Sequence, residues 1–193
     1  MPSTAQTRIT GGAWRGRLLS TPRAQLLRPT RALVREALFN ILGGAVVEAR
    51  VVDLFAGAGT VGFEALSRGA VHATFVDRAE QALAHVRTTA ATLGCGERCR
   101  VVRADAVGWV RSRPAELGRA TIVFVDAPYR DDAVDEVLRA LAEAPPPLVV
   151  CEHHRARVLP DRVGRLALVR RSRYGLTELS VLRRSGDEEG DGD

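Results

Sequence analysis

Two short segments of the chain combine acidic, aromatic and glycine or proline residues in a way that suits ligand binding and group transfer. Residues 51–62 read VVDLFAGAGTVG, and residues 122–129 read IVFVDAPY. Each begins with an apolar, β-branched run typical of a buried strand and continues into a loop of polar or turn-forming residues. Because the carboxyl ends of parallel strands meet at one edge of a sheet, the two loops are expected to share a pocket.

The first segment predicts a binding site for a nucleoside cofactor. Gly57, Gly59 and Gly62 satisfy the pattern G-x-G-x-x-G after a strand and before a helix, where absent Cβ atoms allow a sharp turn and close approach to a ligand. Nicotinamide oxidoreductases use the same pattern, and so do tight turns that hold no ligand. Asp53 favours a methionine-containing cofactor, because a carboxylate at the end of this strand suits a cationic amino group better than a pyrophosphate.

Two further carboxylates end the next two predicted strands. Asp77 lies twenty residues after Gly57, a position from which it can accept hydrogen bonds from both hydroxyls of a ribose. Asp105 follows the third strand and can meet the adenine amino group, although a role as the N-cap of the next helix is about as well supported. The predicted cofactor-binding residues are Asp53, Phe55, Gly57, Gly59, Asp77 and Asp105.

The second segment suits a flat base that carries an amino group. An exocyclic amine is a poor nucleophile, because its lone pair is delocalised into the ring. The Asp126 carboxylate and the Ala127 carbonyl can accept its two hydrogens, Pro128 restricts the backbone, and Tyr129 can stack on the base. An ordinary turn would contain similar residues. Together with the first segment, the pattern predicts methylation of a nucleobase amine by S-adenosylmethionine, without a metal.

The remaining elements predict an α/β fold with a mostly parallel sheet of seven strands and helices on both faces. Apolar strands alternate with helices from residue 51 to residue 151, which is typical of βαβ units. An antiparallel hairpin, residues 166–170 and 177–182, closes the sheet. We expect a basic hairpin–helix extension over residues 1–45, with strands at 8–10 and 17–19, then a methyltransferase domain over 46–184 and a disordered acidic tail over 185–193.

Charge and composition favour a soluble protein with a polyanionic partner. The first 50 residues contain eight arginines and two glutamates, whereas residues 185–193 contain five acids and no base, so the net charge without this tail rises from +5 to +10. Arginine suits phosphate through its planar fork. No apolar run approaches membrane-spanning length and the N-terminus lacks an apolar signal core, so a cytoplasmic location is expected. Cys95, Cys99 and Cys151 predict reduced structural thiols, and His153-His154 a solvated pair in a loop.

Several longer motifs resemble the RsmD family, which methylates guanine N2 in bacterial 16S ribosomal RNA. The resemblance covers roughly residues 8–183, and its motifs are GGAWRGRL at 11–18, RPT at 28–30, VREALFNIL at 34–42, DLFAGAGTVG at 53–62 and YGLT at 174–177. It implies a Rossmann-like class I methyltransferase with a reversed final strand, acting as a monomer on an assembling 30S subunit. The family usually has proline where this chain has Ala127, which keeps the carbonyl but loses rigidity.

Other readings remain open from the sequence alone. A DNA amino-methyltransferase or a glutamine methyltransferase would share the Asp126 loop, and an RNA-binding module could retain the fold without catalysis. The basic N-terminal block separates these alternatives only in part. Arg15, Arg17 and Arg28 are predicted to contact rRNA phosphates, while Trp14 and Leu19 could simply dock the hairpin on the core.

Overall fold

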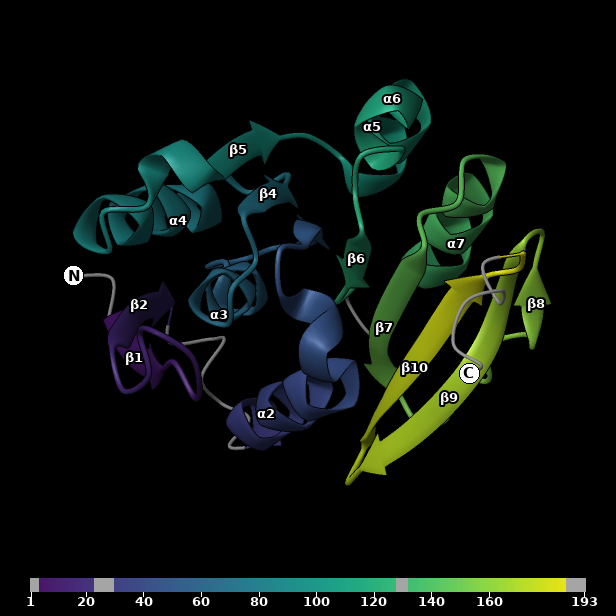
Figure 1. Cartoon of the computed structure of the whole chain (residues 1–193), viewed down its shortest axis with the longest axis horizontal. Coiled ribbons are helices and arrows are strands. Elements are labelled where there is room, and N and C mark those ends of the chain that lie inside the picture. Colours follow the sequence, from purple (N-terminus) through teal and green to yellow (C-terminus); the bar gives the residue numbers. More distant parts are fainter. Residues whose placement is uncertain (1–3, 23–29, 128–131, 187–193) are drawn as a thin grey trace, which may run out of the picture.

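The computed structural model describes residues 4–22, 30–127 and 132–186, and within them an α/β fold with two sheets (Figure 1). The strands are β1 (Thr4–Arg8), β2 (Leu18–Pro22), β3 (Arg50–Leu54), β4 (His72–Asp77), β5 (Cys99–Arg103), β6 (Ile122–Val125), β7 (Leu148–His154), β8 (Arg162–Val163), β9 (Leu166–Tyr174) and β10 (Thr177–Arg184). The helices are α2 (Thr30–Leu42), η1 (Gly43–Val46), α3 (Thr60–Ser67), α4 (Glu80–Thr92), η2 (Gly96–Arg98), α5 (Ala106–Ser112), α6 (Pro114–Leu117) and α7 (Ala133–Glu143).

The large sheet has the strand order β5-β4-β3-β6-β7-β10-β9-β8 over the described residues. The first five strands are parallel to one another, and β10 is antiparallel to both of its neighbours, β7 and β9. This confirms the predicted mostly parallel sheet with an antiparallel last strand. The structure adds β8, a two-residue edge strand, to the seven predicted strands.

Helices cover both faces of the sheet because its central strands are apolar on both sides. Helices α2, α3 and α4 contribute to one buried cluster with Val51, Phe75 and Phe124, whereas α5, α6 and α7 contribute to a second cluster with Val52 and Val123. The side chains of a strand alternate between faces, so each strand supplies both clusters. Helices thus cover both faces of the sheet, and the loops leave it at the two ends of its strands (Figure 1).

The N-terminal hairpin is longer than the sequence suggested. Strands β1 and β2 are antiparallel, and their paired residues extend from Thr4 opposite Pro22 to Arg8 opposite Leu18. The sequence predicted shorter strands at 8–10 and 17–19, with a loose arm before them. The residues between the strands form the turn that docks on the domain. The backbone N–H of Trp14 donates to Ser67 Oγ, whose hydroxyl donates to the Gly11 carbonyl at 2.6 Å. The hairpin therefore packs on the end of α3.

Glu64 of α3 is the centre of this docking. Its side chain is fully buried and accepts hydrogen bonds from the backbone N–H groups of Thr10 and Gly11. It also pairs with Arg68 at 2.9 Å and with Arg35 of α2 at 3.2 Å, and Arg35 in turn donates to the Arg8 carbonyl. A buried carboxylate is stable only when it is paired and hydrogen-bonded, so α2, α3 and the hairpin stabilise one another.

Three smaller findings complete the comparison with the sequence. His153 is buried in β7, where its Nε2 lies 2.8 Å from Ser180 Oγ, so the prediction of a solvated loop pair was wrong. The strand continues past residue 151 because β10 pairs with it as far as His154. Within the described ranges, no helix combines the length and apolarity needed to cross a membrane. The acidic tail after residue 186 lies outside the described residues, and the predicted domain boundaries stay a prediction.

Candidate active site

The carboxyl ends of β3, β4 and β6 lie side by side and carry the predicted acidic residues. Strand β3 pairs with β4 on one side and with β6 on the other. Leu54, its last residue, lies opposite Val76 of β4 and opposite Val125 of β6. The backbone N–H of Asp126 lies 3.5 Å from the Leu54 carbonyl. The loops that begin at Phe55 and at Asp126 therefore leave the sheet from neighbouring strands at the same edge.

The loop after β3 turns through three residues with positive φ. Phe55, Gly57 and Gly59 have φ values of 60°, 54° and 75°. A positive φ is natural for glycine but uncommon for phenylalanine, so Phe55 occupies a strained backbone conformation of the kind that gathers at binding sites. The Ala56 N–H donates to the Val76 carbonyl and the Gly59 N–H to the Ala56 carbonyl, which holds the loop against β4.

Two of the three glycines are required by packing inside the protein. A Cβ atom built on Gly59 would lie 2.9 Å from Phe75 Cε1, and one on Gly62 would overlap the same ring even more closely. Phe75 itself packs on Phe63, with ring centroids 4.9 Å apart. The sequence predicted that these glycines allow the backbone to approach a ligand closely. That explanation is incomplete, because Gly59 and Gly62 also allow α3 to pack against β4.

Asp53 is a buried carboxylate at the centre of the site. It is 2% exposed, and its Oδ2 accepts a hydrogen bond of 3.0 Å from the backbone N–H of Gly62. Burial raises the pKa of Asp53 well above its usual range, the Gly62 N–H opposes this, and the negative charges of Asp126 and Asp77 raise it further. Three carboxylates thus lie close enough to interact, and a cation in this pocket would favour their ionised forms.

Asp77 connects the glycine loop to the end of β4. Its Oδ2 accepts from the Gly57 N–H at 2.8 Å and its Oδ1 accepts from the Ala79 N–H at 2.8 Å. A carboxylate offers about four acceptor positions, so both oxygens retain capacity for a ligand's hydroxyls. Asp105 is exposed and caps α5, accepting from the Gly108 N–H at 2.9 Å. The capping role considered from the sequence is therefore present.

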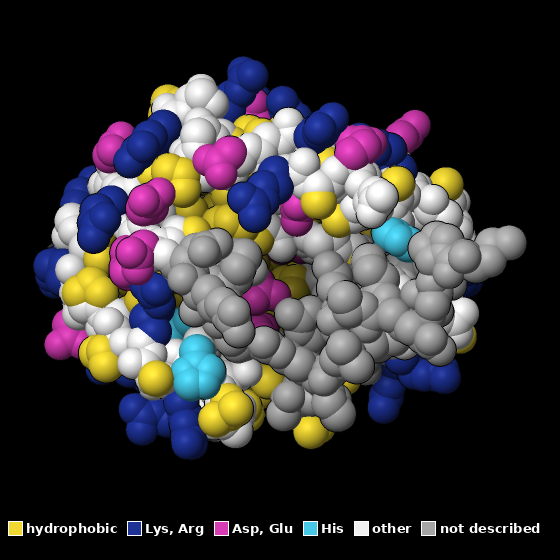
Figure 2. Space-filling view, turned by 180° about the vertical axis from the view of Figure 1, so that it is seen from behind, with side chains coloured by type: hydrophobic (Ala, Val, Ile, Leu, Met, Phe, Trp, Pro, Cys, Tyr) yellow, Lys and Arg dark blue, Asp and Glu magenta, His cyan; other side chains and the backbone are white. Residues whose placement is uncertain are grey.

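The predicted reaction loop is described in part. Asp126 is half-buried and Ala127 is buried at the end of β6, while Pro128 and Tyr129 lie outside the described residues. Of the predicted RNA contacts, Arg15 and Arg17 are exposed on the hairpin and Arg28 lies outside the described residues. Figure 2 shows acidic side chains in a hollow at the centre of one face of the molecule.

Sequence reasoning missed the buried ion pair that docks the N-terminal hairpin on α2 and α3. Glu64 and Arg35 form this pair, with no role predicted for either side chain from the sequence. A signal was available, because Glu64 interrupts the otherwise apolar run of α3.

The cysteines are free thiols, and Cys95 Sγ lies 3.7 Å from Cys99 Sγ, a hydrogen bond that lowers the pKa of Cys95 to about 7. In the part of the chain that the structure describes, no group of three or more His, Cys, Asp or Glu side chains is arranged so that it could hold a metal ion.

The fold is that of the class I methyltransferases. A structure described as a S-adenosylmethionine-dependent methyltransferase from Agrobacterium tumefaciens shares it at 15% identity, with a TM-score of 0.67 over 95% of this chain and 71% of that one. The Escherichia coli protein yhhF is more similar, with a TM-score of 0.82 and 34% identity over 93% of this chain and 98% of that one.

The family follows from the sequence comparisons. The family described as conserved hypothetical protein 95 matches residues 7–183. A relative from Escherichia coli (strain K12), named ribosomal RNA small subunit methyltransferase D, is 34% identical over 194 residues, which are 98% of this chain and 96% of the relative. The chain belongs to this family, and the resemblance to the RsmD family is confirmed.

Proposed function

We propose that this protein transfers a methyl group from S-adenosylmethionine to the exocyclic N2 of a guanine in 16S rRNA. The observation that carries the proposal is the adjacency of the β3 and β6 strand ends, which brings Asp53 and Asp126 close enough for the charge of one to raise the pKa of the other. A cofactor held by the first loop would then lie beside an acceptor held by the second. The name of the Escherichia coli relative supports the rRNA substrate.

The carboxylates fit this methyl donor, which carries a positive charge at its sulfonium and at its amino group. Asp53 would hold the amino group, and Asp77 the ribose hydroxyls through the acceptor capacity that Gly57 and Ala79 leave unused. Asp105 would meet the adenine amino group, and Phe55, Gly57 and Gly59 would line the loop. When bound, the donor supplies an electrophilic methyl carbon.

The acceptor loop would position the amine. The Asp126 carboxylate and the Ala127 carbonyl would accept the two N2 hydrogens, Pro128 would restrict the loop, and Tyr129 would stack on the guanine. As the new C–N bond forms and the C–S bond breaks, N2 becomes positively charged and loses one proton, with Asp126 as the local acceptor. Orientation and charge stabilisation would supply most of the acceleration.

The proposed partner is 16S rRNA within an assembling 30S subunit, bound by a monomer of this protein. The acidic pocket repels phosphate, so arginines elsewhere must provide the attraction to RNA. Arg15 and Arg17 on the hairpin, together with Arg28, are proposed to contact rRNA phosphates. Their exposure is compatible with this role for the two that the structure describes.

The experiment that tests the proposal identifies the methylated nucleoside. The protein is incubated with donor labelled in its methyl group and with naked 16S rRNA, 30S particles or duplex DNA, and each product is digested to nucleosides. N2-methylguanosine from one of the RNA substrates is the expected product. Label in DNA, in another nucleoside, or in none of the substrates would contradict the proposal.

A further inference from the structure

A second group of charged residues lies at the other edge of the large sheet, where the parallel strands begin. Arg50 is the first residue of β3, Arg100 is the second of β5, and Arg119 shortly precedes β6. Because β10 is antiparallel, its last residues, Arg183 and Arg184, reach the same edge. We call these five arginines the amino-end rim. None of them belongs to the carboxyl-end pocket described above.

Part of this rim forms a cavity of about 120 Å³ at the beginnings of β3, β4 and β5. Its described lining includes Arg50, His72, Thr74, Arg100, Glu116 and Arg119. Thr74 pairs in register with Val52 on one side and with Arg100 on the other, so these three side chains point to the same face of the sheet. The volume is several times the roughly 10–15 Å³ that one water molecule needs, which leaves room for a tetrahedral anion.

The charges of this cavity favour an anion. Among its described lining residues, three arginines face one glutamate, for a net charge of +2, and Arg100 Nη1 already donates to Glu116 Oε2 at 2.6 Å. Burial lowers the pKa of His72, and the positive charges of Arg50 and Arg100 lower it further. Two guanidinium groups are therefore close to one imidazole, which stays neutral at pH 7 and adds a hydrogen-bonding group to the cavity.

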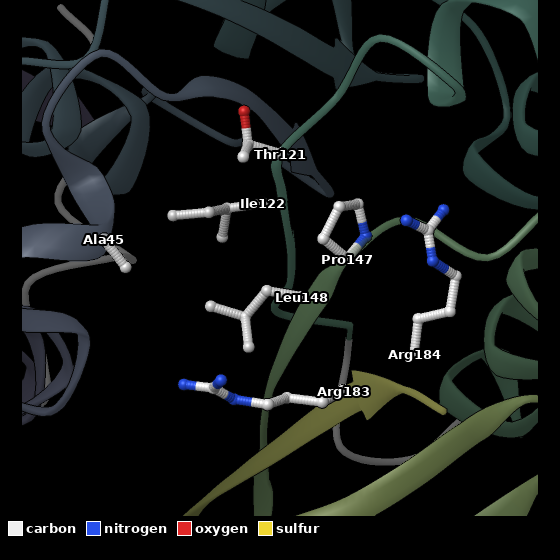
Figure 3. A pocket seen from close by; sticks show the side chains of 7 residues that line it. All are labelled: Ala45, Thr121, Ile122, Pro147, Leu148, Arg183 and Arg184. Atoms are coloured by element: carbon white, nitrogen blue, oxygen red, sulfur yellow. The ribbon is translucent and has the colours of Figure 1, made fainter. Parts of the chain in front are cut away.

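A second cavity, of about 180 Å³, lies at the beginnings of β6 and β7 and the end of β10 (Figure 3). It opens on the opposite face of the sheet from the first cavity, because its Ile122 and Leu148 belong to the buried cluster of Val51 rather than to that of Val52. Figure 3 shows the Arg183 and Arg184 side chains bordering Pro147 and Leu148. Thr121, which lines the second cavity, is tied to the start of β3, since its N–H donates to the Arg50 carbonyl at 2.8 Å and its Oγ1 accepts from the Arg50 N–H at 3.0 Å. This part of the rim combines guanidinium groups with apolar walls.

The rim has the dimensions of an extended ligand. From β5 to β10 the strands span five neighbour spacings, or about 24 Å at ~4.8 Å each. A single phosphate would occupy one cavity, whereas an RNA backbone that crosses this end of the sheet would contact arginines on both of its faces. Arginine forks bind phosphate in a bidentate manner, and the apolar walls suit sugar and base faces.

We propose that the amino-end rim binds the phosphate backbone of a second RNA segment, at the opposite edge of the sheet from the methyl-acceptor pocket. The inference rests on the proposed function, because it takes RNA as the substrate. The strands between the two edges are about 17 Å long, so a large folded RNA can contact both edges, while a hairpin with a stem shorter than this distance cannot. The rim would thus help to select the folded substrate.

The test compares two doubly substituted proteins of equal net charge. The rim variant is Arg50→Gln with Arg119→Gln, and the control is Arg111→Gln with Arg139→Gln, on exposed faces of α5 and α7. Affinity is measured at several salt concentrations for full-length 16S rRNA and for a short hairpin that contains the methylated guanine. For the rim variant, the salt slope on the long RNA should fall in magnitude by about 1.4–1.8, from two lost phosphate contacts.

The expected result has three parts: the rim variant binds the long RNA more weakly, it binds the short hairpin as the unsubstituted protein does, and the control retains both affinities. Unchanged binding of the long RNA, or an equal loss in the control, would overturn the proposal. Methyl transfer is assayed in the same samples. If the unsubstituted protein methylates no RNA, the proposed function fails, whereas the binding comparison still decides whether the rim holds RNA.

Discussion

The two edges of the large sheet carry different clusters of charged residues. The carboxyl-end edge holds four carboxylates, Asp53, Asp77, Asp105 and Asp126, and the amino-end rim holds five arginines. A pocket of carboxylates attracts a cationic methyl donor but repels the phosphates of an RNA. The contrast teaches that the proposed donor site and the proposed second RNA contact call for different surfaces, which lie one strand length apart.

The parallel sheet itself produces this separation. In β3, Arg50 is the first residue and Asp53 the last but one. Arg100 is the second residue of β5 and Asp105 follows that strand, while Arg119 precedes β6 and Asp126 follows it. Parallel strands place all their beginnings at one edge and all their ends at the other, so these arginines gather at one edge and these aspartates at the other.

The largest expected effect comes from the acidic edge. Replacing Asp126 with alanine should lower kcat by about 10²–10³-fold, because the amine loses a charged hydrogen-bond acceptor in the transition state. Donor affinity should change little, since the donor is assigned to Asp53 and Asp77. Transfer of labelled methyl groups and calorimetric titration with the donor measure the two quantities. Turnover close to that of the unsubstituted protein would remove Asp126 from the proposed chemistry.

The next effect concerns the donor alone. Asp77→Ala should raise the donor Kd about 10–100-fold, because the substitution removes the ribose acceptor and both backbone hydrogen bonds that hold Gly57 and Ala79. Asp161→Ala, which removes an exposed carboxylate paired with Arg171, is the matched control. If both variants bind the donor equally well by calorimetry, the acidic edge is not its site.

The pH dependence of donor binding should reveal Asp53. Its pKa in the free protein is raised by burial, so a cationic donor that favours the ionised carboxylate must release a proton on binding. Donor affinity should rise with pH until the raised pKa of the free protein is reached, by at most about tenfold per pH unit. Between the ordinary aspartate pKa, about 3.9, and the raised value, the free energy of unfolding should fall as pH rises, because the folded state keeps the proton longer.

Asp53→Asn is the variant that isolates this effect. It should flatten both the pH profile of donor affinity and the decline of the unfolding free energy, since asparagine does not titrate. Donor titrations and denaturant melts at a series of pH values measure the two profiles. A profile in the variant as steep as that of the unsubstituted protein would assign the proton to another group.

The smallest effect is expected from the hairpin. Arg15→Gln with Arg17→Gln should weaken RNA binding and reduce the salt slope by about 1.4–1.8, while donor affinity stays constant. The Arg111 and Arg139 double variant again controls for net charge. Equal RNA affinity and an unchanged slope would leave these two arginines as a solvated surface and assign the attraction to other basic residues.

Much of this arrangement was predictable from the sequence because strand ends are local features. The apolar runs before Asp53, Asp77 and Asp126 define where each strand stops, and strand polarity then fixes the edge at which the acids gather. The amino-end rim was not predicted, because Arg183 and Arg184 reach it only through the position of β10 beside β7, which the local sequence does not specify. The packing reason for Gly59 and Gly62 was also hidden, since the ring they accommodate, Phe75, belongs to another strand.

The buried Glu64 has a consequence for how the chain must be made. The hairpin and α2 are synthesised first, yet the carboxylate that gathers Thr10, Gly11 and Arg35 arrives only with α3. Until then Arg35 has no charge partner in this position, and the early segment gains little by becoming compact. Native order at the N-terminus is therefore acquired late, and a fragment that ends before α3 should remain unfolded.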